Sequence, residues 1–247
     1  MPRPPAIGVI CDHNPGNMDK FGGDEAHDFL NARYPHSIAD AGGTPWLLGI
    51  PQQDRVEADA ATYLDRLDGL MMTGCGRHLD PTAYGESPRF ELSLMAAAKQ
   101  AFEMTLFVEA RRRSLPVLAI CGGMQTANAA LGGTLIQCIG EEVTDPLEHM
   151  QTEKATHTVH PVNVTPGTRL AKILGCERVE TNSSHTQSVA RPGTGLTVAA
   201  TTSDGVIEAL EGTDGSWLVM VQWHPEYLYR EHPPQARLIT AFIDACR

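Results

Sequence analysis

A cysteine stands where a predicted strand turns directly into a predicted helix. Four apolar residues, 117–120, precede Cys121 and a helical pattern follows it, with the small residues Ala119 and Gly123 two positions to either side. A tight strand-to-helix turn lifts its central side chain above a sheet and requires small neighbours. The amides and the positive end of the following helix favour the thiolate, which is the reactive form of cysteine. The pattern predicts a nucleophile at Cys121, and the alternative is a structural cysteine packed at a strand end.

A histidine and a carboxylate follow another apolar segment near the C-terminus. His224 and Glu226 follow residues 217–222, with Trp223 between the segment and the histidine. A thiol nucleophile needs a base within reach and a third group that fixes the tautomer of that base. Residues i and i+2 of an extended chain project to the same side, so Glu226 can orient His224. The alternative is an ordinary solvated loop, because chain distance alone does not bring a cysteine and a histidine together.

Composition excludes several classes of protein. The chain has 247 residues, of which 42% are hydrophobic and 20% charged, as expected for a globular protein with a sizeable core. The 19 Lys and Arg against 30 Asp and Glu give a net charge of −11, which argues against nucleic acid and anionic membranes as partners. No apolar run reaches the length of a membrane span and no signal peptide is recognisable, so a cytoplasmic location is expected. The six cysteines form no CxxC pair, which predicts neither a zinc site nor a disulfide framework.

Strand-like and helix-like segments alternate through the first half of the chain. The predicted strands are residues 6–11, 45–48, 69–73 and 117–120, and the predicted helices are residues 24–41, 55–67, 89–113 and 122–131. Further strands at residues 156–164, 196–201, 206–210 and 217–222 precede a last helix at residues 235–246. Such alternation predicts an α/β fold with a mostly parallel central sheet, helices on both faces and extra β-strands in the C-terminal half. No polar linker divides the chain, so residues 1–247 are interpreted as a single domain.

Taken together, these segments resemble the class I glutamine amidotransferase-like superfamily, and within it the peptidase C26 hydrolases typified by gamma-glutamyl-gamma-aminobutyrate hydrolases. The matching stretches are Tyr34 with residues 41–45, residues 68–74, Pro81 to Gly85, residues 119–135, residues 182–187, residues 203–209 and residues 222–226. The resemblance implies a three-layer, flavodoxin-like fold. It also implies a Cys121, His224 and Glu226 triad that cleaves a gamma-glutamyl amide through a glutamyl thioester, with no metal or organic cofactor.

The resemblance further implies an oxyanion hole made of backbone N–H groups. One donor would be Gly122, after the nucleophile, and the other would come from the Gly74-Cys75 loop. Three residues depart from the family pattern: Cys75 replaces a glycine, Gly122 replaces a bulky or basic residue, and Ala119 replaces a glycine. Cysteine keeps its amide proton but tolerates a positive φ poorly, so a changed loop geometry is expected at Cys75.

Four polar residues are predicted at the substrate pocket through the same resemblance: Gln125, Asn182, Ser183 and His185. Gln125 could equally satisfy buried helix amides, and His185 could be an ordinary core or surface histidine. Five other histidines have no such context and are interpreted as surface or loop residues: His13, His78, His149, His157 and His160.

The leading functional interpretation is a stand-alone hydrolase of a small gamma-glutamyl conjugate, with gamma-glutamyl-gamma-aminobutyrate from polyamine breakdown as the first candidate. The alternatives are the glutaminase component of an amidotransferase, a hydrolase of another gamma-glutamyl compound such as a folate polyglutamate, and a binding protein without catalysis. The complete set of Cys, His and Glu argues against the last. The expected partner is a small-molecule substrate, and assembly into a homo-oligomer such as a dimer is left open.

Overall fold

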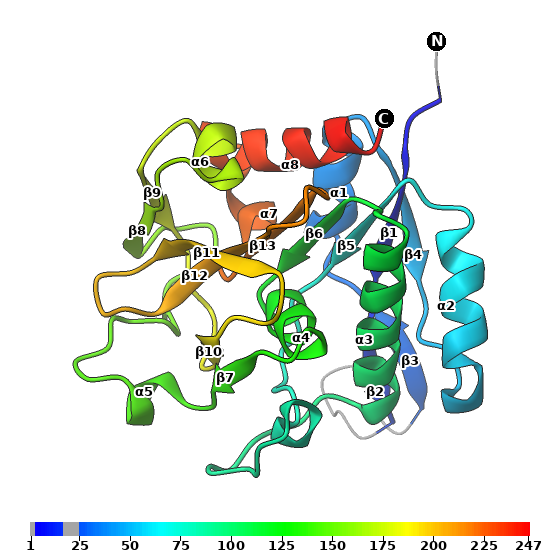
Figure 1. Cartoon of the computed structure of the whole chain (residues 1–247), viewed down its shortest axis with the longest axis horizontal. Coiled ribbons are helices and arrows are strands. Elements are labelled where there is room, and N and C mark those ends of the chain that lie inside the picture. The colour runs from blue at the N-terminus through cyan, green and yellow to red at the C-terminus, as the bar shows by residue number, and fades with distance from the viewer. Residues whose placement is uncertain (1–2, 17–24) are drawn as a thin grey trace.

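One large mixed sheet forms the centre of the computed structural model, which describes residues 3–16 and 25–247 (Figure 1). Its parallel half contains, in spatial order, β4 (Thr44–Leu48), β1 (Ala6–Ile10), β5 (Gly69–Met72), β6 (Val117–Ile120) and β13 (Leu218–Val221). The antiparallel half continues with β12 (Ile207–Gly212), β11 (Leu196–Thr201), β8 (His160–Val164) and β9 (Arg178–Thr181). Beside this path, β10 (Ser188–Arg191) pairs with β12 and with β7 (Thr134–Ile136). The strands β2 (Asp12–Pro15) and β3 (Ala26–Phe29) form a separate two-stranded sheet.

Helices cover both faces of the large sheet. The first face carries α2 (Val56–Leu64), α3 (Ala97–Arg112) and α4 (Gly122–Ala130). The second carries α1 (Arg33–Asp40), α6 (Arg169–Leu174) and α8 (Pro233–Ala245). The remaining short helices are α5 (Ile139–Glu142), α7 (Pro225–Leu228) and the 3-10 turns η1 (Gln53–Arg55) and η2 (Pro81–Tyr84). Among the described residues, no helix combines the length and the apolar character needed to cross a membrane.

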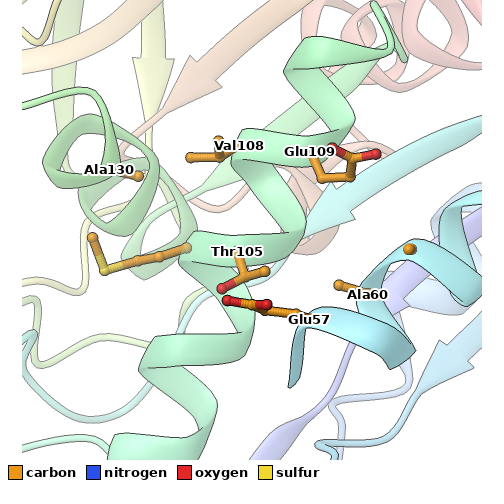
Figure 2. Close-up of a pocket in the computed structure, with 8 residues that line it drawn as sticks. Glu57, Ala60, Thr105, Val108, Glu109 and Ala130 are labelled. Atoms are coloured by element: carbon orange, nitrogen blue, oxygen red, sulfur yellow. The ribbon is translucent and has the colours of Figure 1, made fainter. Parts of the chain in front are cut away.

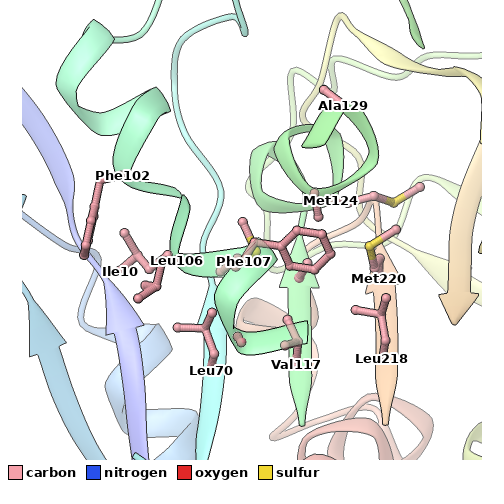
Figure 3. Close-up of a cluster of buried hydrophobic side chains, with 14 of the residues drawn as sticks. Ile10, Leu70, Phe102, Leu106, Phe107, Val117, Met124, Ala129, Leu218 and Met220 are labelled. Carbon is pink, nitrogen blue, oxygen red and sulfur yellow. The ribbon is translucent and has the colours of Figure 1, made fainter. Parts of the chain in front are cut away.

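The strand β6 is buried on both of its faces, which explains why its sequence is apolar at every position. Val117 and Ala119 pack into the core under α3 and α4, whereas Leu118 and Ile120 pack into the core on the opposite face. A strand of a parallel sheet that is covered on both sides reads as a continuous apolar run. Figure 3 shows the first core, where Phe107 and Leu106 of α3 meet residues of the central strands. Truncating a fully buried phenylalanine such as Phe107 to alanine costs about 3–5 kcal/mol of stability.

The mostly parallel sheet with helices on both faces is confirmed, but two predicted helices are too long. In the predicted helix 24–41, residue 24 lies outside the described part, residues 26–29 form β3, and the helix begins at Arg33. Long-range contacts explain β3, because Asp28 accepts hydrogen bonds from His13 Nδ1 (2.7 Å) and the amide of Ile50 (2.9 Å). In the predicted helix 89–113, the helix begins at Ala97. The residues before it are held in an extended path that includes a bridge between His78 and Leu94.

Two histidines that were predicted to be surface or loop residues are buried, and one of them lies in a strand. His149 is 3% exposed and His160 is 5% exposed. His160 lies in β8, which is paired with β9 and β11, and His149 contacts Asp204 in the turn before β12. Their burial comes from the antiparallel half of the sheet, whose pairing joins segments far apart in the sequence.

Candidate active site

The proposed nucleophile lies at a strained strand-to-helix turn. Cys121 connects β6 to α4 with φ 51° and ψ −111°, a conformation that non-glycine residues rarely adopt. Its amide donates to Val221 O (2.8 Å), and its carbonyl accepts from the amide of Gln125 (3.1 Å), so both sides of the turn are fixed. A Cβ on Gly123 would lie 2.7 Å from Met72 O, which explains why this position has no side chain. Strain of this kind persists only where the surrounding structure holds it, and it is common at active sites.

The candidate base follows β13, the neighbour of β6 in the sheet. His224 Nδ1 lies 2.7 Å from Glu226 Oε1, and the Glu226 side chain is fully buried. A carboxylate only accepts, so Nδ1 carries the proton and Nε2 is left for the thiol. Burial alone would lower the pKa of His224, but the charges of Glu226 and Cys121, and hydrogen bonds to both, raise it well above its usual value.

Cys121 and His224 converge on the loop after β5. A Cβ placed on Gly74 would lie 2.8 Å from His224 Cε1 and 3.4 Å from Cys121 Cβ, so the two side chains meet over this glycine. Since β5, β6 and β13 are parallel neighbours, their carboxyl ends bring the three segments to one edge of the sheet. The structure therefore brings Cys121 together with His224 and Glu226, which follow it by more than 100 residues in the sequence.

Three residues were predicted as candidates for the two oxyanion donors, and the backbone amide of one of them is already engaged. The Gly74 amide donates to the hydroxyl of Tyr34 (2.9 Å). The Cys75 amide has no hydrogen-bond partner among the described residues, and it lies 2.9 Å from the point where a Cβ of Gly122 would sit. Cys75 is not among the described non-glycine residues with positive φ, so the expected strain at this position does not arise. The geometry favours Cys75 and Gly122, rather than Gly74, as the pair of free donors.

Tyr34 is a residue near the site to which sequence reasoning assigned no role. Its side chain is buried, and its hydroxyl lies 3.4 Å from His224 Nδ1 as well as beside Gly74. Burial, together with the nearby charges of Glu226 and Cys121, raises the pKa of Tyr34 well above its usual value, so the hydroxyl stays protonated. Tyr34 belonged to a matching stretch of the family pattern, but nothing in that stretch indicated its contact with residue 224.

Two of the predicted substrate residues have structural roles in the site. The side chain of Asn182 donates to His224 O (3.0 Å) and accepts from the amide of His224 (2.8 Å), which fixes the backbone of the candidate base. Ser183 donates to His149 O (2.9 Å) and is buried. Neither residue lines the pockets beside Cys121, whereas their neighbour Ser184 lines both of them.

The other two predicted substrate residues do line a pocket. Gln125 and His185 border a space of about 130 Å³ next to Cys121. Both side chains also contact the backbone of the protein. Gln125 Nε2 donates to Gln187 O (2.9 Å), and His185 Nδ1 lies 3.0 Å from the same carbonyl. Other residues around this space are Cys75, Gly76, Arg77, His78, Met150, Ser184, Thr186 and Gln187. His78 was expected at the surface or in a loop; it is a half-buried loop residue that borders this space.

A second space, of about 200 Å³, lies on the His224 side of the thiol. It is bordered by Asp12, residues 29–31, Tyr34, residues 74–76, Ser184, His224 and Tyr227. A further pocket of about 530 Å³ lies elsewhere, between α2 and α3, and Figure 2 shows Glu57, Thr105 and Val108 lining it. The residues that line this pocket include none of the predicted site residues. The candidate active site is therefore the pair of smaller spaces at the edge of the sheet.

Comparison with known proteins identifies the family. The family model of peptidase C26 matches residues 5–226. The chain belongs to the peptidase C26 family. It is 30% identical over 256 residues to the gamma-glutamyl-gamma-aminobutyrate hydrolase of Escherichia coli O157:H7, covering 98% of this chain and 94% of the relative. It is 38% identical over 219 residues to a Mycobacterium tuberculosis protein with a provisional glutamine amidotransferase name, covering 88% of this chain and 67% of the relative.

Solved structures support the same fold for this peptidase C26 protein. The glutaminase domain of a Trypanosoma brucei CTPS with bound acivicin aligns with a TM-score of 0.64 at 16% identity, covering 98% of this chain and 93% of that one. A glutamine amidotransferase from Thermotoga maritima aligns with a TM-score of 0.59 at 15% identity, covering 97% and 82%. The fold is that of the class I glutamine amidotransferases, and membership of peptidase C26 supports an enzyme that hydrolyses amide bonds.

Proposed function

We propose that this protein is a cysteine-dependent hydrolase that cleaves the gamma-glutamyl amide bond of a small conjugate, with gamma-glutamyl-gamma-aminobutyrate as the first candidate. The observation that carries the proposal is the convergence of Cys121 and the His224–Glu226 pair over Gly74, between two small pockets. With this substrate, a role in polyamine breakdown and a cytoplasmic location are part of the same proposal.

In the first half of the reaction, the Cys121 thiol gives its proton to His224 Nε2 and the thiolate sulfur attacks the gamma-carbonyl carbon. The resulting oxyanion would accept hydrogen bonds from the amides of Cys75 and Gly122, and each donor of this kind lowers the barrier by about 2.7–4 kcal/mol. His224 then returns the proton to the departing amine nitrogen. The carbon–nitrogen bond breaks, and a glutamyl thioester remains on Cys121.

In the second half, water replaces the amine. His224 takes a proton from this water as it attacks the thioester carbonyl, and the thiolate leaves and regains the proton. Glutamate is released, and Glu226 stays ionised throughout because its task is to orient the imidazole and stabilise the imidazolium.

The two pockets suggest how a substrate lies. The amine must leave next to His224, so the space bordered by Tyr34 and Tyr227 suits the leaving group. The glutamyl part then enters the space bordered by Gln125 and Arg77. The Arg77 guanidinium donates to Ser93 Oγ (3.2 Å) and would have to turn toward this space to pair with the alpha-carboxylate of glutamate. Binding the leaving group gives the enzyme remote contacts that stabilise the transition state.

A panel of substrates tests the proposal. The purified chain alone is assayed for glutamate release from gamma-glutamyl-gamma-aminobutyrate, other gamma-glutamyl amines, a folate polyglutamate and glutamine, with Cys121→Ala as the blank. We expect the highest kcat/KM for a conjugate of a small amine. The competing function is the glutaminase component of an amidotransferase, which the name of the Mycobacterium tuberculosis relative favours. Glutamine as the best substrate, or turnover only after a second protein is added, would replace the hydrolase proposal with that one.

A further inference from the structure

A second cluster of titratable side chains lies in the core behind the pocket wall. It consists of His149, His160, His185 and Glu208, which we call the histidine cluster, and each residue is at most 5% exposed. Glu208 Oε1 lies 3.3 Å from His149 Nδ1 and 3.5 Å from His185 Nε2. The ring of His149 lies 5.0 Å from that of His160 and 4.9 Å from that of His185, measured between centroids. The reaction proposed for Cys121 uses none of the four side chains.

The outer contacts of two rings fix which nitrogen carries the proton. His149 Nε2 lies 2.9 Å from Asp204 Oδ2, and His185 Nδ1 lies 3.0 Å from Gln187 O. Carboxylate and carbonyl oxygens only accept hydrogen bonds, so these two nitrogens are the protonated ones. In the neutral rings, His149 Nδ1 and His185 Nε2 then point unprotonated lone pairs at the Glu208 carboxylate. Three acceptors face one another without a donor between them.

The other polar atoms of the cluster also lack hydrogen-bond partners among the described residues. In the part of the chain that the structure describes, neither nitrogen of His160 and neither oxygen of Glu208 has a hydrogen-bond partner. Burying an ionised carboxylate without compensation is costly, so such groups are paired or coordinate a metal. Protons on His149 and His185 would pair Glu208 but would leave both nitrogens of His160 unpaired. A single cation among the four side chains would pair Glu208 and bind one nitrogen of each ring, so that only the second nitrogen of His160 stays without a partner among the described residues.

We propose that the histidine cluster is a structural binding site for one divalent transition metal of the zinc class, held by His149 Nδ1, Glu208, His160 and His185 Nε2. Candidate ligand atoms of His149, His160 and Glu208 all lie within 4.8 Å of one another. Tetrahedral zinc with bonds of about 2.0–2.1 Å places neighbouring ligand atoms about 3.3 Å apart, which is close to the two distances measured to Glu208 Oε1. His185 lies outside this group of three, so both His160 and His185 have to move inward to complete the set.

The surroundings match those of known metal-binding histidines. A ligating histidine usually donates its other ring N–H to a carboxylate or a carbonyl, as His149 does to Asp204 and His185 to Gln187. Imidazole and carboxylate ligands suit zinc. The two positive charges of the metal are balanced by Glu208 and Asp204, so the filled core carries no net charge.

Such a metal would position the pocket wall and would not touch the reacting atoms. His149 lies next to Met150, and His185 lies between Ser184 and Thr186; all three neighbours border the space beside Cys121. The bound metal would clamp these two segments to β8 and β12. Loss of the metal is therefore expected to raise KM more than it lowers kcat.

The test measures metal content directly. The tag-free protein is stripped with a strong chelator, supplied with Zn²⁺ or Co²⁺ and desalted, and its metal is counted by elemental mass spectrometry. We expect about one metal per chain, a Co²⁺ absorption spectrum typical of tetrahedral sites, and a higher melting temperature after metal is added to the stripped protein. His160→Gln should lose the bound metal, whereas the control His157→Gln, whose side chain is 61% exposed, should keep it.

The outcome does not depend on any single variant. If the stripped wild-type protein takes up no Zn²⁺ or Co²⁺ and its melting temperature does not respond, the cluster is a protonated ion-pair network and the proposal is wrong. Equal metal binding by wild type and His160→Gln, with both proteins folded, would also place the metal elsewhere. Because these readouts do not involve catalysis, they stand apart from the test of the proposed hydrolase.

Discussion

The amide nitrogen of Cys75 lies 2.9 Å from the position that a Cβ on Gly122 would occupy. The Cβ of Cys75 lies 3.3 Å from the same point. The family resemblance implies that Cys75 stands in place of a glycine and Gly122 in place of a bulky or basic residue. We interpret the two departures as one exchange, in which the Cys75 side chain occupies the room that a side chain at position 122 would need.

We predict that Gly122→Ala disrupts the oxyanion hole without unfolding the protein. The added methyl group meets backbone at Cys75 and must push the two donors apart. Loss of one donor lowers kcat by about 10²–10³-fold, which steady-state kinetics would measure. Cys75→Gly in the same chain frees the loop to move aside and should restore part of the rate. Gly140→Ala is the control, because a Cβ there meets nothing within 4 Å; full activity in Gly122→Ala would disprove this geometry.

Cys121 is expected to be the residue that a glutamine-like electrophile labels. Burial raises the pKa of Cys75 to about 12 and that of Cys11 to about 11, so these thiols remain protonated and unreactive at neutral pH. Mass spectrometry of the labelled, digested protein should find the adduct at Cys121 and none in Cys121→Ala. An adduct at Cys75 or at Cys138 would move the nucleophile to that residue.

Local patterns predicted the nucleophile and the base, because their geometry depends on neighbours in sequence. The turn at Cys121 needs only a buried strand, small flanking residues and a helix, and the 2.7 Å contact between His224 and Glu226 joins residues two positions apart. Partners from distant segments gave no such signal. Asn182 holds the backbone of His224 across 42 residues, and the Tyr34 contact spans 190 residues.

The histidines were misjudged for a related reason. His149 sits in polar sequence without apolar periodicity, so nothing local indicated its burial. His160 shares a strand face with Val162 and Val164, and this alternation was a local signal that the sequence analysis did not use. The pairing of β8 with β9 and β11, and the turn at Asp204, bring them inside. That arrangement depends on the whole antiparallel half of the sheet. The sequence analysis predicted several strands of this half but not β9 and β10.

Glu226→Gln should lower turnover and shift the pH profile. By analogy with a neutralised triad carboxylate, kcat should fall by up to about 10⁴-fold. Although burial lowers the pKa of His224, the Glu226 charge is the largest factor that raises it, so the substitution must lower it. The alkaline limb of kcat/KM, where His224 loses its proton from the thiolate–imidazolium pair, should move to lower pH. An unchanged rate, or a limb that moves to higher pH, would remove Glu226 from the proposed triad.

The buried ion pair below the Cys75 loop is expected to matter for stability. Lys99 and Glu103 are fully buried and paired, Lys99 Nζ also donates to Cys11 O (3.2 Å), and Thr126 donates to Glu103 (3.1 Å). Burial alone would lower the pKa of Lys99, but Glu103 raises it, so the pair stays charged.

Lys99→Met should lower the free energy of unfolding by about 3–5 kcal/mol, because it leaves a buried carboxylate without its partner. Adding Glu103→Leu removes that charge and should restore much of the loss. Urea denaturation measures both variants. Arg112→Met, which breaks an exposed pair with Glu109, is the control and should leave the transition unchanged. If the double variant were less stable than Lys99→Met, the unpaired charge would not be the cause.

Tyr34→Phe should reduce catalysis with little effect on the fold, because the ring stays packed while the hydroxyl is lost. That hydroxyl accepts from the Gly74 amide at 2.9 Å and lies 3.4 Å from His224 Nδ1, so it links the oxyanion loop to the base. One hydrogen bond contributes about 0.5–1.5 kcal/mol, which corresponds to a kcat lower by up to about 10-fold. Tyr84→Phe is the matched control, because the Tyr84 hydroxyl is buried and has no partner among the described residues. Equal kcat values for the two variants, at equal melting temperatures, would show that Tyr34 only fills space, whereas a selective loss in Tyr34→Phe would make it a positioning residue for both halves of the site.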